Sequence, residues 1–171
     1  MNDRTVNAPR EMPCPCRKSI SWWPEAHRLL LALCDDLEAI ADSLPRHVIP
    51  QDCIFAAKTL GRLIRDVRAY EETTLFPALM ERFIASPEIA SAIDRLKSEH
   101  VADECYADDL AEKLLYIGNG GQDVNIEALA YMLRGFFEAM RRHIAYERDH
   151  FSGALEALQA NLKDDPKSYL N

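Results

Sequence analysis

Residues 140–155, MRRHIAYERDHFSGAL, decide the fold. His143 and Glu147 stand four residues apart, so on a helix both side chains point the same way. Steps of three and four residues extend this face into one stripe: Leu129, Leu133, Phe136, Met140, His143, Glu147, His150, Ala154 and Leu158. The stripe predicts a long amphipathic helix. A carboxylate on its inward face is costly to bury unless it is paired or bound to a metal.

The rest of the chain favours helices over strands. Its 171 residues, of which 48% are hydrophobic, suit one domain, and six glycines with few β-branched runs argue against a sheet. Amphipathic helices are predicted over residues 21–44, 52–83 (kinked at Pro77), 86–117 and 124–162. The inward stripe of the second ends with Leu75 and Ala78, and that of the first consists of His27, Leu30, Cys34, Leu37 and Ala41. We therefore expect an all-α, up-down-up-down four-helix bundle over residues 21–162, a loose N-terminal extension over 1–20 and a tail over 163–171.

Charge and composition exclude several classes of function. A net charge of -8 argues against binding to nucleic acid or to an anionic membrane. There is no apolar run near the roughly 20 residues that span a bilayer, and no signal-peptide pattern, so a cytoplasmic protein is expected. Cys14 and Cys16 lie in the extension, where an inert tail is favoured over a metal or redox role. Cys34, Cys53 and Cys105 are expected to be small apolar fillers.

The inward stripes of the other three helices also carry ligand-type side chains. His27, Glu71 and His100 lie on the first, second and third helix. A rise of 1.5 Å per residue places them level with His143, to within about 6 Å, and Glu147 one turn away. Imidazoles and carboxylates without thiolates suit iron, manganese or zinc, and the two carboxylates could bridge a pair of ions. The expected metal ligands are therefore His27, Glu71, His100, His143 and Glu147.

An internal repeat supports this arrangement. EETTLFPAL at residues 71–79 aligns with ERDHFSGAL at 147–155, and the surroundings of His27 resemble those of His100. The two helical hairpins are therefore expected to be copies of one unit, each supplying one histidine and one glutamate.

Three inward histidines, the EETTLFPAL segment and the H-x-x-x-E of the last helix resemble the hemerythrin-like (HHE, cation-binding) four-helix bundles over about residues 22–160. The resemblance implies a non-heme iron centre, most often di-iron, that meets a small diatomic ligand or oxidant such as dioxygen, nitric oxide or peroxide. Reversible binding, sensing, iron handling and peroxide turnover all remain open. So does an enzymatic role, since no other catalytic motif is present.

One departure from the family pattern concerns the second helix. The family places a histidine four residues before the glutamate of that helix, and this chain has Val67 there. The site could then be binuclear with an open position beside Val67, mononuclear, or absent. Glu104, four residues after His100, is the first candidate replacement ligand, because the oxygen carriers of the family use a histidine there. His150 is the second, followed by Tyr70 and Glu72.

The alternative is a metal-free bundle that acts as a regulatory or protein-interaction module. Its histidines and glutamates would form a hydrogen-bonded core. A separate structural interpretation makes Glu71 and Glu72 surface acids that pair with arginines of the same helix: Arg62, Arg65 and Arg68. Zinc or manganese in the same pocket is a further possibility, and either a monomer or a homodimer is compatible with the pattern.

Overall fold

The computed structural model describes residues 19–164, with side chains to residue 160. A short 3-10 turn, Ile20–Trp22, leads into the bundle, which consists of α1 (Trp23–Ser43), α2 (Pro50–Tyr70), a π-helix (Glu71–Leu75), α3 (Phe76–Arg82), α4 (Pro87–Gly118) and α5 (Ile126–Asp164). Cys14, Cys16 and nearly all of the predicted extension and tail lie outside the described residues. The expected all-α class is confirmed, because the described residues form helices and no strand.

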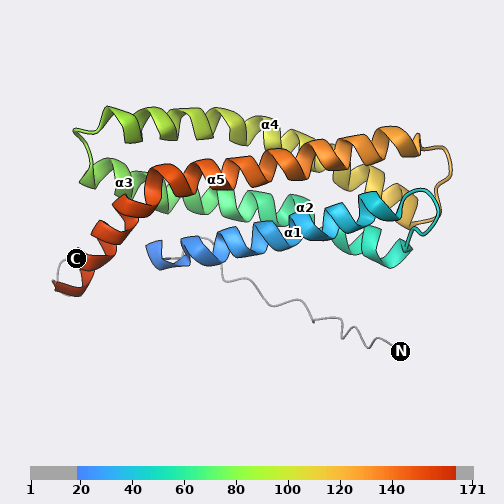
Figure 1. Ribbon diagram of the computed structural model, residues 1–171, viewed down its shortest axis with the longest axis horizontal. Helices are drawn as coiled ribbons and strands as arrows, with labels where there is room; N and C mark the ends of the chain where they lie inside the picture. The colour runs from blue at the N-terminus through green and yellow to red at the C-terminus, as the bar shows by residue number, and fades with distance from the viewer. Residues whose placement is uncertain (1–18, 165–171) are drawn as a thin grey trace.

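The long helices lie side by side, and the links between them alternate between the two ends of the bundle (Figure 1). α1 packs against α5, and α2 packs against α4. Prolines in the first turns of α2 and α4 suit positions whose N–H has no partner within the helix. Within the described residues, no helix is long and apolar enough to cross a membrane.

The helix predicted over residues 52–83 is interrupted earlier than Pro77. The N–H of Phe76 donates to the carbonyl of Glu71, five residues back, which is the hydrogen bond of a π-helix. Pro77 has no N–H and cannot donate to the carbonyl four residues before it. The extra residue of the π-helix shifts the inward-facing position by one residue towards the C-terminus. Leu79 is therefore buried where the stripe predicted Ala78. The irregularity therefore begins at Glu71, a predicted metal ligand.

Two apolar clusters form the core. The larger one contains Leu37, Leu60, Leu110 and Leu133, towards the α1–α2 and α4–α5 links, and the smaller one contains Phe76 and other residues near the α3–α4 end. All five predicted stripe residues of α1 are buried, as expected. They are His27, Leu30, Cys34, Leu37 and Ala41.

Two details of the core differ from the prediction. Near the end of α5, Phe151 and Leu155 are buried, whereas His150 is exposed and Ala154 half-buried. The bulkier apolar side chains take the inward positions because their burial stabilises the fold more. Cys105 is exposed, while Cys34 and Cys53 are buried fillers as expected.

Candidate metal centre

Six buried polar side chains lie between the two apolar clusters, and we call them the polar layer. They are His27, Arg68, Glu71, His100, His143 and Glu147. α1, α2, α4 and α5 each contribute, and the π-helix supplies Glu71. Glu71 and Glu147 are both 0% exposed. A layer with two fully buried carboxylates requires compensating cations or hydrogen-bond donors.

The structure brings the five first-choice ligands together. The Nε2 atom of His27 lies 2.7 Å from Oε2 of Glu147, and Nε2 of His100 lies 3.4 Å from Oε2 of Glu71. The Nε2 atom of His143 is 3.6 Å from Oε1 of Glu147. Each histidine therefore directs Nε2 at a buried carboxylate.

Outer carboxylates fix two of the three imidazoles. Nδ1 of His100 donates to Oε1 of Glu72 over 2.7 Å, and Nδ1 of His143 donates to Oε2 of Glu99 over 3.1 Å. With the proton on Nδ1, each Nε2 presents a lone pair to the interior. Metal-binding histidines in proteins are usually held in this way. Glu72 is thus an orienting group, and Glu99 is half-buried against His143.

His27 is held differently. Nε of Arg148 donates to Nδ1 of His27 over 3.2 Å. A neutral His27 therefore carries its proton on Nε2 and donates it to Glu147. A metal bound at this nitrogen would have to displace that proton. Because Arg148 is exposed, its side chain can move aside when the proton shifts to Nδ1.

Arg68 is the member of the polar layer that sequence reasoning missed. Its side chain is 2% exposed, and its Nη1 donates to Oε2 of Glu71 at 3.0 Å and to Nε2 of His143 at 2.8 Å. Its Nη2 donates to Oδ2 of Asp103 at 3.0 Å. The suggested surface pairing with Glu71 and Glu72 is not observed for Arg62 and Arg65: both are exposed, but they pair with Asp66 and Asp108. Arg68 instead turns inward.

The proposed replacement ligands do not join the layer. Glu104 is half-buried, and within the described part of the chain no hydrogen bond or ion pair joins it to the layer; on α4 it is Asp103 that reaches Arg68. His150 is exposed and donates from Nδ1 to the carbonyl of Tyr146. Tyr70 is buried, but its hydroxyl donates to the carbonyl of Ile20. Val67 is completely buried in the larger apolar cluster.

Burial and charge set the protonation of the layer. Burial, assisted by the charge of Arg68, lowers the pKa of His100 to about 2, so this imidazole is neutral and can act as a ligand. Burial and then the charge of Glu147 raise the pKa of Glu71 well above its ordinary value. Although burial disfavours its charge, the carboxylates of Glu71 and Glu147 raise the pKa of Arg68.

Some buried acceptor atoms of the layer have no hydrogen-bond partner and are available to bind a cation. Among the described side chains, three buried acceptors of the layer have no hydrogen-bond partner: Oε1 of Glu71, Nε2 of His100 and Oε1 of Glu147. Each unpaired buried group costs about 1–3 kcal/mol, and coordination to metal would remove this cost. Two overlapping sets have ligand atoms within 4.8 Å of one another: His27, Glu71 and Glu147, and His100, His143 and Glu147. Ligand atoms about 2.0–2.2 Å from one ion have this spacing after small adjustments.

A cleft between α4 and α5 reaches the layer. Its volume is about 360 Å³, and its lining includes Arg95, Glu99, Asp103, Arg142 and His143. Its lining includes His143, which belongs to the layer, and Asp103, which accepts a hydrogen bond from Arg68. The cleft is therefore a route by which a small ligand could approach the buried donors.

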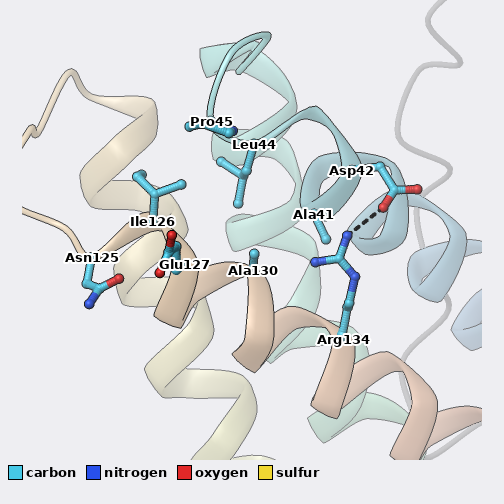
Figure 2. A pocket seen from close by; sticks show the side chains of 9 residues that line it. All are labelled: Ala41, Asp42, Leu44, Pro45, Asn125, Ile126, Glu127, Ala130 and Arg134. Carbon is cyan, nitrogen blue, oxygen red and sulfur yellow. Dashed lines mark hydrogen bonds and ion pairs between the residues drawn. The ribbon is translucent and has the colours of Figure 1, made fainter.

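A second pocket, of about 530 Å³, lies between the end of α1 and the start of α5 (Figure 2). Figure 2 shows the ion pair between Arg134 and Asp42, 2.7 Å long, that spans its edge. Neither histidine nor cysteine lines it, and no residue of the polar layer is among its walls. We therefore place the candidate metal centre in the polar layer.

Comparison with known proteins gives one match. The family model described as the hemerythrin HHE cation binding domain matches residues 18–155, which include the whole polar layer. No curated protein and no solved structure shows significant similarity to the chain.

Proposed function

Because the chain belongs to the hemerythrin HHE cation-binding domain family, we propose that the polar layer holds non-heme iron and meets a small diatomic ligand or oxidant there. The ligands would come from among five residues: His27, Glu71, His100, His143 and Glu147. The observation that carries the proposal is the group of three buried acceptor atoms without hydrogen-bond partners. They belong to Glu71, His100 and Glu147, and neither water nor a protein donor is needed to satisfy them if a cation lies among them.

The chemistry of the donors supports iron. Neutral imidazoles and carboxylates are the ligands of non-heme iron centres, and zinc and manganese accept the same set. None of the three described cysteines lies in the layer, so a thiolate site is not favoured. Bound iron would supply exchangeable coordination positions for dioxygen, nitric oxide or peroxide. The residues of this chain would hold the ion, exclude bulk water through the two apolar clusters and admit the ligand through the α4–α5 cleft.

The test is a direct count of metal. Protein expressed with added iron and purified without chelator should retain iron on elemental analysis, at about one ion per chain or more. The same protein stripped by a chelator should melt at a lower temperature and recover when Fe(II) is added without oxygen, because a ligand that binds the folded state stabilises it. A preference for zinc or manganese over iron in the same assay would change the identity of the proposed metal but not the residues that bind it.

A metal-free regulatory or interaction module is the second candidate. Arg68 favours it, because its guanidinium already supplies one buried positive charge to Glu71. On this view the layer is a structural network of hydrogen bonds. Purified protein would then contain almost no metal, and its melting temperature would not change on addition of Fe(II).

The outer carboxylate of Glu72 gives a second prediction. Glu72→Gln should weaken metal binding by about 10- to 100-fold, because the negative charge that orients His100 and makes its Nε2 a better metal ligand is lost. Metal affinity would be measured by competition with a chromophoric chelator. Glu112→Gln, on the exposed face of α4, is the matched control and should bind metal as the unaltered protein does. Equal affinities in Glu72→Gln and Glu112→Gln would contradict His100 as a ligand.

A further inference from the structure

Arg68 introduces a permanent cation into the candidate metal centre. A guanidinium keeps its proton at any pH that a folded protein tolerates. Its Nη1 lies 3.0 Å from Oε2 of Glu71 and 2.8 Å from Nε2 of His143, and its Nη2 lies 3.0 Å from Oδ2 of Asp103. Residues from the π-helix, α4 and α5 therefore hold this side chain in place.

The atoms that Arg68 uses are atoms that a second metal ion would need. Two overlapping ligand sets share Glu147, and His143 belongs to the set with His100. The lone pair of His143 Nε2 already accepts a hydrogen bond from Arg68. The other set, His27, Glu71 and Glu147, remains available to a metal ion, and the Oε1 atoms of both glutamates have no hydrogen-bond partner. Nε2 of His100 is a further acceptor without a partner.

The charge of the layer also favours one metal ion over two. Two fully buried carboxylates, Glu71 and Glu147, and the Asp103 carboxylate share one guanidinium, which leaves two negative charges to be compensated. A single divalent ion changes this balance by two charges. A pair of divalent ions would bring four positive charges next to Arg68 in a low-dielectric interior, where like charges repel strongly.

We propose that the guanidinium of Arg68 occupies the position of a second metal ion, so that the centre holds one metal ion and one fixed organic cation. The proposal rests on the proposed function and specifies it. Two features of the nearby sequence agree with this role. Arg68 directly follows Val67, which stands where the family pattern has a ligand. Arg68 also lies three residues before Glu71, on the same side of the helix. Arg68 is a positioning residue, since it fixes His143 and Glu71 and limits the number of ions.

The test compares the unaltered protein with Arg68→Met, which keeps an unbranched side chain without the charge, and with Arg65→Met, a control on the exposed face of the same helix. Each protein is stripped of metal, titrated with Mn(II), desalted and analysed for manganese. We expect one ion per chain in the unaltered protein and in Arg65→Met, and two in Arg68→Met. Electron paramagnetic resonance provides an independent readout: isolated Mn(II) ions in the first two proteins and an exchange-coupled pair in the third.

Two bound ions or a coupled spectrum in the unaltered protein would overturn the proposal, and this measurement does not depend on the folding of any variant. One ion in both the unaltered protein and a folded Arg68→Met would also overturn it, because Arg68 would not then be the group that closes the second position. No ion in the unaltered protein with either Mn(II) or Fe(II) would contradict the proposed function itself, so the two failures can be distinguished.

Discussion

Replacing Glu147 with alanine is expected to empty the metal centre and to abolish the stabilisation that metal gives. Glu147 is the one residue common to both ligand sets, and its carboxylate is completely buried. Its loss should weaken metal binding by more than the roughly 10- to 100-fold that loss of an outer partner costs. Elemental analysis of the purified variant and its melting temperature with and without Fe(II) would measure both effects.

The metal-free protein separates this effect from a purely structural one. Without metal, Glu147→Ala removes the 2.7 Å hydrogen bond to His27 and should cost on the order of 1–3 kcal/mol of unfolding free energy. Glu104→Ala on α4 is the control: it removes a half-buried carboxylate that makes no ion pair with the layer, and should leave metal content unchanged. If Glu147→Ala retained the metal content of the unaltered protein, the buried layer could not be the metal centre.

The positions of the five expected ligands could be read from the sequence because helical periodicity alone decides them. His27, His100 and His143 fall on inward stripes together with leucines, and the rise per residue fixes their common height. The same periodicity predicted the burial of Glu71 and Glu147 against the usual preference of carboxylates for water. Apolar neighbours three and four residues away on each helix are therefore stronger evidence than the residue type itself.

Arg68 could not be found in this way, because what buries it comes from other helices. A helix with Arg62, Arg65 and Arg68 suggests a solvated basic face, and the first two side chains follow that expectation. Arg68 is drawn inward by Asp103 of α4 and His143 of α5, which are far from it in the sequence. The spacing of three residues to Glu71 was the one local signal.

The π-helix is a second feature that the sequence indicated incompletely. Pro77 marks a disturbance in the helix, but the missing hydrogen bond of a proline affects the preceding turn. The register change therefore lies at Glu71–Leu75 and shifts Leu79 inward. Sequence periodicity assumes one regular helix and cannot place the extra residue, which is why Ala78 was expected at the core position.

Replacing Arg68 with methionine is expected to destabilise the metal-free protein strongly. Glu71, His143 and Asp103 all lose their common donor, and removal of one partner from a buried ion pair typically costs about 3–5 kcal/mol. For a chain of this size such a loss lowers the melting temperature by roughly 10 °C. Arg65→Met, which breaks a surface ion pair with Asp108, should cost about 1 kcal/mol or less.

The loss of unfolding free energy in Arg68→Met, relative to the unaltered protein, should also depend on pH. Arg68 opposes the burial that raises the pKa of Glu71, so its loss raises that pKa further above the ordinary value of 4.5. It also helps to lower the pKa of His100 to about 2, so its loss lets this pKa rise towards 6.5. In both cases the folded variant binds more protons than the folded parent at mildly acidic pH, whereas the unfolded chains bind the same number.

Stability of the variant relative to the parent must therefore rise as the pH falls. We expect the destabilisation to be largest near pH 8 and to shrink towards pH 5, by at most about 1.4 kcal/mol per pH unit for each proton involved. Urea unfolding of both chelator-treated proteins at several pH values would measure the difference. If the destabilisation stayed constant over this pH range, Arg68 would stabilise the layer by packing alone. The proposal that its charge takes the place of a second metal ion would then fail.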